Sequence, residues 1–200
     1  MLGGRSAAMG ATKAGPKPEP HDDVRLIGRI RDGDARAFEE LYRAYHPRLT
    51  RFIGAILRRA PQVEEVLNDT LMVVWTHADR YNGKSRVSTW IFAIAYRKAL
   101  KALRRHDEPI EDRQAETRPS RDASPEQQLG RRESQALLLG AIGGLSADHR
   151  AVVDLTYFHE IGYREIAEIM DCPVDTVKTR MFHARRHLKN RLSGQLTDWL

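Results

Sequence analysis

The stretch Thr176–Arg191 constrains the fold of this 200-residue chain more than any other segment. Its sixteen residues include six lysines and arginines, two histidines and no acid. It follows the amphipathic segment Tyr163–Met170 and a short break at Asp171-Cys172-Pro173. A small amphipathic helix, a tight turn and a basic second helix are typical of a helix-turn-helix. At roughly 1.5 Å per residue the second helix is about 24 Å long, which suits the major groove of duplex DNA.

Composition limits the kind of partner and the compartment. The formal net charge of +6 points to a polyanion, although charge alone does not separate DNA from RNA or from a membrane surface. An apolar content of 41% is enough for helical cores in one or two domains. No run of about 18 apolar residues occurs, so we expect no membrane insertion. The single cysteine, Cys172, rules out an internal disulfide framework and favours a cytoplasmic location.

Apolar residues recur at helical spacing across residues 23–105, and no alternating strand pattern interrupts them. Asp34 is expected to cap a helix that ends at His46-Pro47. Pro61 is expected to open the next helix, because proline is favoured in the first turn. Ser88 or Thr89 is expected to cap the last helix of this domain. The pattern predicts a helical domain over residues 23–105.

The rest of the chain divides by composition. Residues 1–22, rich in Gly, Ala and Pro, predict a flexible N-terminal tail. Residues 106–128 contain seven acids, three arginines, three prolines and almost no apolar residue, which predicts a flexible linker over 106–130. A second helical domain is expected over 131–195, with Ser146 capping the helix before the helix-turn-helix. The predicted fold class is all-α: two small helical domains joined by a flexible acidic linker, the second containing the helix-turn-helix.

A second acid-free stretch, Lys84–Arg105, carries seven basic residues. Aromatic residues are interleaved with its cations or directly precede them: Tyr81, Trp90, Phe92 and Tyr96. Cations bind phosphates and an exposed ring can stack on an unpaired base, so the pattern favours contact with partly opened DNA. The alternative is that Trp90, Phe92 and Ile94 are core residues and that the cations only solvate the outer face.

Four segments together resemble the extracytoplasmic-function sigma factors, the compact two-domain branch of the bacterial sigma-70 family. The most specific is residues 166–180 (IAEIMDCPVDTVKTR) with Phe182–Arg186, which is similar to the family's fourth conserved region. The others are residues 36–45, 64–75 and 88–95. A lone helix-turn-helix would be weak evidence. Four matches in the family's order, with a polar linker between the halves, are strong.

The resemblance implies a transcription initiation factor that binds core RNA polymerase, directs it to specific promoters and assists DNA melting. It implies polymerase contacts at Glu65, Asn68, Asp69, Leu71 and Trp75. It implies contacts with the promoter −10 element at Lys84, Arg86, Trp90, Arg97, Lys98, Lys101, Arg104 and Arg105. It implies contacts with the −35 element at Thr176, Lys178, Thr179, Arg180, Phe182, His183, Arg185 and Arg186. The alternative for the acidic residues of the polymerase set is that they are the solvated face of a helix.

Two positions depart from the family pattern. Asp175 stands where relatives usually carry glycine, and we expect it to act as an N-cap at the positive end of the helix dipole. Arg97 stands where many relatives carry an asparagine that holds a flipped −10 base, so the −10 preference is expected to be unusual.

The predicted linker is long enough to span the distance between the two promoter elements, because about 23 residues extend to roughly 75 Å. Elements about 17 base pairs apart are separated by roughly 58 Å.

The histidines, the cysteine and the remaining motifs of the sequence do not indicate a catalytic role. His183 and His187 have a metal-ligand spacing, but no carboxylate or thiol converges on them, so DNA-facing or solvated histidines are favoured and no metal site is predicted. Cys172 is interpreted as a packing residue rather than an oxidant sensor. No nucleophile-base pair or phosphate-cradling glycine loop occurs, so we expect no enzyme activity, no cofactor and no small-molecule substrate.

Two other functions remain open from the residues. One is a stand-alone helix-turn-helix regulator, although no dimerisation helix is evident. The other is an RNA-binding module. Relatives are often held inactive by an anti-sigma factor, so the resemblance also implies such a partner.

Overall fold

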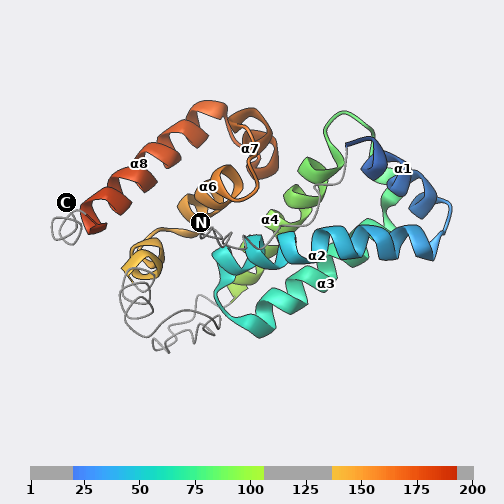
Figure 1. Ribbon diagram of the computed structural model, residues 1–200, viewed down its shortest axis with the longest axis horizontal. Coiled ribbons are helices and arrows are strands. Elements are labelled where there is room, and N and C mark those ends of the chain that lie inside the picture. The colour runs from blue at the N-terminus through green and yellow to red at the C-terminus, as the bar shows by residue number, and fades with distance from the viewer. Residues whose placement is uncertain (1–19, 106–136, 193–200) are drawn as a thin grey trace, which may run out of the picture.

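The computed structural model describes residues 20–105 and 137–192, and over these ranges all regular structure is helical. The first half (residues 20–105) contains α1 (Pro20–Arg31), α2 (Ala35–Leu57), α3 (Ala60–Thr76), the 3-10 helix η1 (Ala78–Arg80) and α4 (Val87–Arg105). The second half (residues 137–192) contains a helical segment over 137–143, then α6 (Ala147–Tyr157), α7 (Tyr163–Met170) and α8 (Val174–Leu192). The all-helical fold class is confirmed (Figure 1). The predicted linker lies outside the described residues.

Helix α2 shows one prediction confirmed and one wrong. Asp34 caps it, because its carboxylate accepts from the backbone N–H groups of Arg36 at 2.9 Å and Ala37 at 3.2 Å. The helix does not end at Pro47 but continues for 23 residues in all. A proline inside a helix removes one backbone hydrogen bond. The loss is offset by a continuous buried stripe on both sides of it: Tyr45, Leu49, Phe52, Ile53 and Ile56.

The next two helices begin close to their predicted starts. Pro61 lies in the first turn of α3, as expected. Helix α4 begins at Val87, so Ser88 and Thr89 lie inside its first turn rather than at a cap. The carbonyl of Arg86 accepts from the N–H of Trp90 at 3.1 Å and so starts the helical ladder. In the second half, Ser146 caps α6 as predicted, since its side chain accepts from the N–H of His149.

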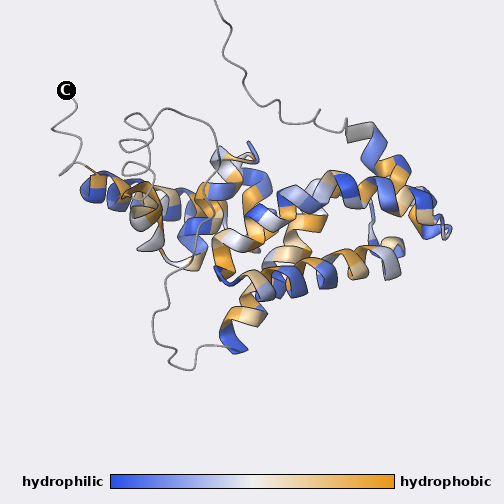
Figure 2. Cartoon of the chain, turned by 60° about the horizontal axis from the view of Figure 1, so that its bottom comes forward, coloured by the Kyte–Doolittle hydropathy of each residue, from blue (hydrophilic) through white to orange (hydrophobic). Residues whose placement is uncertain are grey.

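The two halves pack directly on each other. Helices α1, α3 and α4 pack around α2, while α8 packs on α6 and α7. Helix α6 in turn packs on α2, and α7 packs on α4. Buried apolar residues of both halves form one continuous cluster. Figure 2 shows hydrophilic residues along the outer faces and hydrophobic residues where the helices meet. Nothing in the sequence pattern predicts this contact between the halves.

No helix in the described ranges has the length and apolar character that crossing a membrane requires.

Candidate nucleic-acid interface

Helices α7 and α8 form the predicted helix-turn-helix. Asp171 closes α7 in the left-handed conformation at φ +49°, and the N–H of Cys172 returns to the carbonyl of Ala167 at 3.0 Å. Helix α8 then buries only one narrow stripe, formed by Val177, Met181 and Ala184. Residues spaced at i, i+4 and i+7 share one helix face, so the other faces of α8 are left to solvent or a partner.

Most of the residues predicted to contact the −35 element lie on the open faces of α8. The exposed ones are Lys178, Thr179, Phe182, His183, Arg185 and Arg186, and Thr176 and Arg180 are half-buried. Phe182 is 60% exposed, which is unusual for a large apolar side chain. Arg180 forms an ion pair with α6, because its guanidinium lies 2.5 Å from the carboxylate of Asp148. The open faces of α8 are therefore cationic, with one exposed aromatic ring among the cations.

Asp175 does not act as the predicted N-cap. Helix α8 begins one residue earlier, and the carbonyl of Pro173 accepts from the N–H groups of Thr176 and Val177. Asp175 thus lies within the first turn, where its charge still favours the helix dipole. Its carboxylate lies 2.9 Å from the ammonium group of Lys178. An acid therefore pairs with one of the cations predicted to bind DNA.

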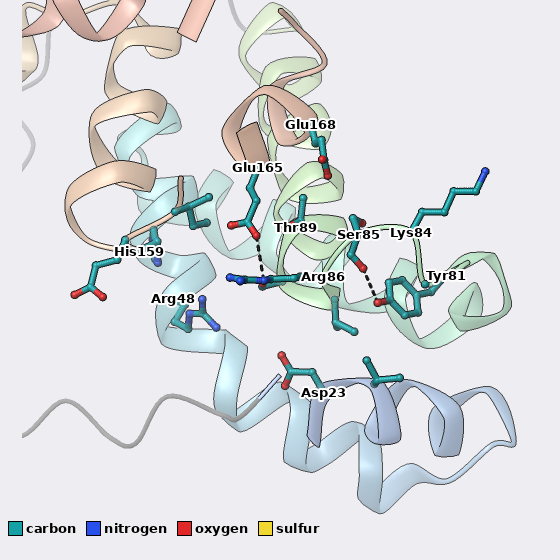
Figure 3. Close-up of a pocket in the computed structure, with 16 residues that line it drawn as sticks. Asp23, Arg48, Tyr81, Lys84, Ser85, Arg86, Thr89, His159, Glu165 and Glu168 are labelled. Atoms are coloured by element: carbon teal, nitrogen blue, oxygen red, sulfur yellow. Dashed lines mark hydrogen bonds and ion pairs between the residues drawn. The ribbon is translucent and has the colours of Figure 1, made fainter. Parts of the chain in front are cut away.

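The loop before α4 is shaped by a glycine turn and by contacts of its side chains. Gly83 turns it with a φ of +74°, which favours glycine. The Tyr81 hydroxyl donates to the carbonyl of Ser85 at 2.6 Å, and the Tyr81 ring lies 5.5 Å from that of Trp90. Arg86 points toward α7 of the second half, where its Nε lies 3.1 Å from a Glu165 carboxylate oxygen (Figure 3). The loop thus holds a pair of rings and a cation already engaged with the second half.

Helix α4 is cationic mainly at its C-terminal end. Among the residues predicted to contact the −10 element, Lys84, Arg86, Arg97, Lys101, Arg104 and Arg105 are exposed, while Trp90 and Lys98 are half-buried. Phe92 is fully buried and Tyr96 is 4% exposed, so neither ring is available for base stacking in this conformation. The core interpretation therefore holds for Phe92 and for buried Ile94, whereas Tyr81 and Trp90 keep some exposed surface.

The residues predicted to bind polymerase separate into a surface set and a buried set. Glu65, Asn68 and Asp69 are exposed on α3, together with the large apolar side chain of Met72. Asp69 also pairs with Lys98 of α4 at 2.9 Å. Leu71 is only 2% exposed, so it belongs to the core and offers no contact surface. Trp75 is half-buried, with its ring 5.2 Å from that of Phe38.

A cavity of about 770 Å³ separates the loop before α4 from the second half (Figure 3). Its walls carry cations from the first half and carboxylates from α7, including Arg86 and Glu165. Asp23 of α1 closes one side, where burial raises the pKa of its carboxyl group and the Tyr45 hydroxyl donates to it at 2.5 Å. The cavity marks where the two halves meet over the predicted −10 surface.

Three histidines of the second half surround a smaller cavity of about 320 Å³: His149, His183 and His187. The rings of His149 and His183 lie 6.3 Å apart. Burial lowers the pKa of His149, and the neighbouring His183 and Arg180 lower it further. Within residues 20–105 and 137–192, no three side chains converge in a way that could hold a metal ion.

Comparison with known proteins places both halves in one family. Residues 41–108 match the family model for Sigma-70 region 2, and residues 128–188 match that for Sigma-70, region 4. The chain is 30% identical over 184 residues to the ECF RNA polymerase sigma factor RpoE of Cereibacter sphaeroides, covering 88% of this chain and 98% of that protein. The chain belongs to the extracytoplasmic-function sigma factors.

Another relative agrees with this assignment, and two solved structures share the fold. The ECF RNA polymerase sigma-E factor of Haemophilus influenzae is 27% identical over 180 residues, covering 85% of this sigma factor and 95% of that one. The RpoE sigma factor of Bartonella quintana, solved with the anti-sigma factor NepR, has a similar fold with a TM-score of 0.65 at 22% identity, covering 80% and 99% of the two chains. CnrH, solved with the cytosolic domain of CnrY, gives 0.64 at 21% identity, covering 87% and 99%.

Sequence reasoning missed the residues that join the two halves of this sigma factor. Arg150 and Asp154 are both buried on α6, at i and i+4 of a helix that is otherwise largely apolar. Charged residues are almost never fully buried unless they are paired. The one available signal was this pair of charges between the apolar residues of a short helix, and it does not name their partners.

Proposed function

We propose that this sigma factor binds core RNA polymerase and directs it to promoters, with α8 reading the −35 element and the loop and helix α4 reading and opening the −10 element. The observation that carries the proposal is the pairing of two cationic surfaces in one chain. One is the open side of a helix-turn-helix, and the other is the C-terminal end of α4 with the Tyr81–Trp90 ring pair. Duplex and unpaired DNA call for these two different surfaces.

The −35 contact is assigned to the N-terminal part of α8, because recognition helices contact base edges with their first turns. Lys178 and Thr179 are exposed there. Arg185 and Arg186 lie further along the helix, where cations contact phosphates and set the register without reading sequence. The half-buried Arg180, paired with Asp148, would act first by holding α8 in place.

The −10 contact is assigned to the loop over residues 82–86 and to α4. Lys84 and Arg86 would bind phosphates, and Trp90 with Tyr81 would offer ring surface to an unpaired base. Arg97 is exposed further along the same helix, so its guanidinium could stack on a base or bind a phosphate. This arrangement supports melting, because an unpaired base gains a stacking surface that a duplex cannot use.

The polymerase contact is assigned to the exposed face of α3. Glu65, Asn68 and Asp69 supply a polar and acidic rim, and Met72 supplies an apolar centre that is 59% exposed. An anti-sigma factor is proposed as a second partner, since the solved relatives CnrH and RpoE were each captured with another protein bound. With these partners we propose a cytoplasmic location, and we propose no enzyme activity.

The test is transcription from duplex genomic fragments by core polymerase with and without the protein. New, discrete start sites are expected only with it, and they should disappear in the Lys178→Ala/Arg186→Ala variant. Arg43→Ala is the matched control, because Arg43 is an exposed cation of α2, distant in sequence from both surfaces. If no start appears but the protein binds duplex DNA tightly without polymerase, the stand-alone regulator becomes the better assignment.

A further inference from the structure

The cavity surrounded by three histidines lies between the loop before α6 and one flank of α8. Its volume of about 320 Å³ holds a phosphate group with ordered waters, because one water occupies about 30 Å³ in the liquid. No acid is among the described residues that line it. The lining therefore suits an anion. Its polar side chains are His149, His183, His187, Arg186, Ser146 and Asn190.

The ring of His149 is oriented by the cap of α6. The Ser146 hydroxyl, which caps that helix, lies 2.9 Å from Nδ1 of His149. The other ring nitrogen, Nε2, is then the one that can bind a ligand. The centroid of the His183 ring lies 6.3 Å from that of His149. Since charge-assisted N–H···O distances are about 2.7–2.9 Å, two rings at this separation can donate to oxygens of one phosphate.

His187 lines the cavity beside a glycine. Its Nε2 is buried, and no described residue gives that nitrogen a hydrogen-bond partner. A Cβ atom at Gly144 would lie 2.7 Å from the same nitrogen, which is closer than side-chain carbons approach other atoms. Glycine at this position therefore makes room for the imidazole. A buried polar atom without a partner is rare, so Nε2 is expected to bind a ligand or an ordered water.

The loop that closes the cavity is held from its other side by two cations. Arg58 of α2 donates to the carbonyl of Gly143, and Arg150 of α6 donates to that of Leu145. Arg150 also donates to carbonyl oxygens in the last turn of α2, including that of Ile56 at 2.9 Å. The loop therefore has a fixed position over the cavity, and both guanidinium groups add positive charge near it.

The cavity opens beside the surface of α8 that the proposed function assigns to the −35 element. His183 and Arg186 are exposed and belong to that surface. Figure 1 shows α8 along the outer edge of the second half. The major groove is about 12 Å wide and a helix with its side chains is about 10–12 Å across. The flanks of a recognition helix therefore lie against the two phosphate rows that border the groove.

The charges around His149 oppose its protonation in the free protein. Burial lowers the pKa of His149, and the positive charge of neighbouring groups lowers it further. These neighbours are His183, Arg180 and His187, while Asp148 acts in the opposite direction. The Asp148 carboxylate accepts from the Tyr96 hydroxyl of α4 at 2.7 Å and also binds Arg180. A bound phosphate would place negative charge beside the ring and favour its protonated form.

We propose that this cavity is a phosphate site that receives one backbone phosphate of the −35 duplex, and that its histidines take up a proton when the phosphate binds. The proposal rests on the proposed function for the identity of the DNA. A phosphodiester has no group that titrates in the histidine range, so the protein takes up the proton. Affinity should rise as the pH falls through the pKa that the histidines have in the complex. It should stop rising below the pKa of the free protein, which for His149 is under 6.5.

The first experiment measures the affinity of the full chain for a −35 duplex between about pH 8 and pH 6 at constant salt, by fluorescence anisotropy. Affinity should rise by about tenfold, because a shift of one pKa unit in one group corresponds to tenfold. His149→Gln and His187→Gln should each lose most of that rise. His77→Gln is the matched control, because His77 is a half-buried histidine that follows α3, outside the cavity. Equal pH dependence in all four proteins would overturn the site.

A second pair of variants moves one ring without changing any charge. Gly144→Ala adds a methyl group where the His187 imidazole lies, so the ring should turn out of the cavity and part of the rise in affinity should be lost. Gly140→Ala adds the same group where the described residues leave open space, so the full rise should remain. Circular dichroism checks that both variants fold. A full rise in Gly144→Ala would contradict the role of His187.

The third experiment identifies the phosphate with the unaltered protein. Duplexes in which a neutral methylphosphonate replaces one phosphate at a time are compared at the two ends of the pH range. One replacement should remove the pH dependence, while the others lower affinity equally at both ends. If none removes it, or if inorganic sulfate binds at the histidines while duplex affinity is independent of pH, the cavity is no site for a DNA phosphate.

The same titrations separate this site from the proposed function. A chain that stimulates no transcription, but binds duplex DNA with the expected pH dependence, would contradict the proposed function and leave the phosphate site standing. A chain that drives transcription from discrete starts, with −35 affinity independent of pH, would overturn the phosphate site alone.

Discussion

Helices α4 and α8 look alike in sequence and differ in the structure. Each has 19 residues and ends in basic residues. Helix α4 buries nine of its residues, from Val87 to Ala99, whereas α8 buries only three. Helix α4 packs against α2, α3 and α7 and is a central element of the core. Helix α8 lies at the edge of the second half, where it packs on α6 and α7.

The difference shows what an acid-free run can and cannot indicate. Cations stay at the surface in both helices, because burying an unpaired charge is costly. The apolar and aromatic residues between them have no such constraint. In α4 the ring of Phe92 is buried between two other aromatic side chains, and in α8 that of Phe182 is exposed. The same charge pattern therefore accompanies a core helix and a surface helix.

The largest expected effect contrasts those two phenylalanines. Phe92→Ala should lower the free energy of unfolding by about 3–5 kcal/mol, because it leaves a cavity between α2, α4 and the second half. Phe182→Ala should change it by less than about 0.5 kcal/mol, because its ring is mostly in solvent. Urea titration followed by circular dichroism measures both. Similar decreases in the free energy of unfolding for the two variants would contradict the assignment of α4 to the core and of α8 to the surface.

The next effect concerns the open faces of α8. Lys178→Ala/Arg186→Ala should weaken binding to a −35 duplex and reduce the slope of log affinity against log salt by about one, since Arg186 is the phosphate contact of the two and each phosphate contact contributes about one. The slope is obtained from fluorescence anisotropy titrations at several salt concentrations. Arg104→Ala at the end of α4 serves as the comparison, and it should leave the −35 slope unchanged. A reduced slope in that comparison would mean that α4 and α8 share one DNA surface.

A smaller effect is expected at the first turn of α8. Asp175→Asn removes the acid that pairs with Lys178, so affinity for the −35 duplex should rise by about two- to fivefold at low salt. Asp79→Asn is a matched control, because Asp79 is an exposed acid in η1. Isothermal titration against the same duplex compares the two. Weaker binding by the Asp175→Asn variant would show that Asp175 itself contacts DNA bases.

The smallest effect is a pH dependence in the second half, which has no counterpart in α4. The pKa of His149 lies below its ordinary value of 6.5, chiefly because of burial and then because of His183 and Arg180, with Asp148 opposing. The unfolded chain therefore takes up a proton before the folded one does. Stability should be full above about pH 6.5 and fall as the pH drops below it. Thermal unfolding of His149→Gln should show a weaker acid loss, and an unchanged loss would exclude His149 as its source.

Local patterns predicted much of the fold. Asp34 and Ser146 act as caps because their side-chain oxygens accept from free N–H groups, a relation that needs only neighbouring residues. The predicted helix end at Pro47 is wrong for the opposite reason. Whether a helix continues through proline depends on the stripe it buries elsewhere, and here that stripe runs from Tyr45 to Ile56. Tertiary packing overrode the local preference.

The residues of the candidate site also divide into those that local patterns predict and those that depend on tertiary packing. The exposed cations of α8 follow from helical periodicity, and so do the exposed acids of α3. The resemblance implies a polymerase contact at Leu71, because a family motif does not say which of its side chains are buried. The Leu71 side chain lies in the core. The contacts Arg86–Glu165 and Tyr96–Asp148 join residues that are 79 and 52 positions apart. No periodicity within one helix can indicate pairs of that separation.

The bonds from Arg150 to the end of α2 also set an order of events during synthesis. Ile56 leaves the ribosome 94 residues before the arginine that will bind its carbonyl. At about 5–20 residues per second that interval lasts roughly 5–19 s, far longer than a small helical domain needs to fold. The first half must therefore reach its native structure with water at those carbonyls. The emerging second half then docks onto a surface that already exists.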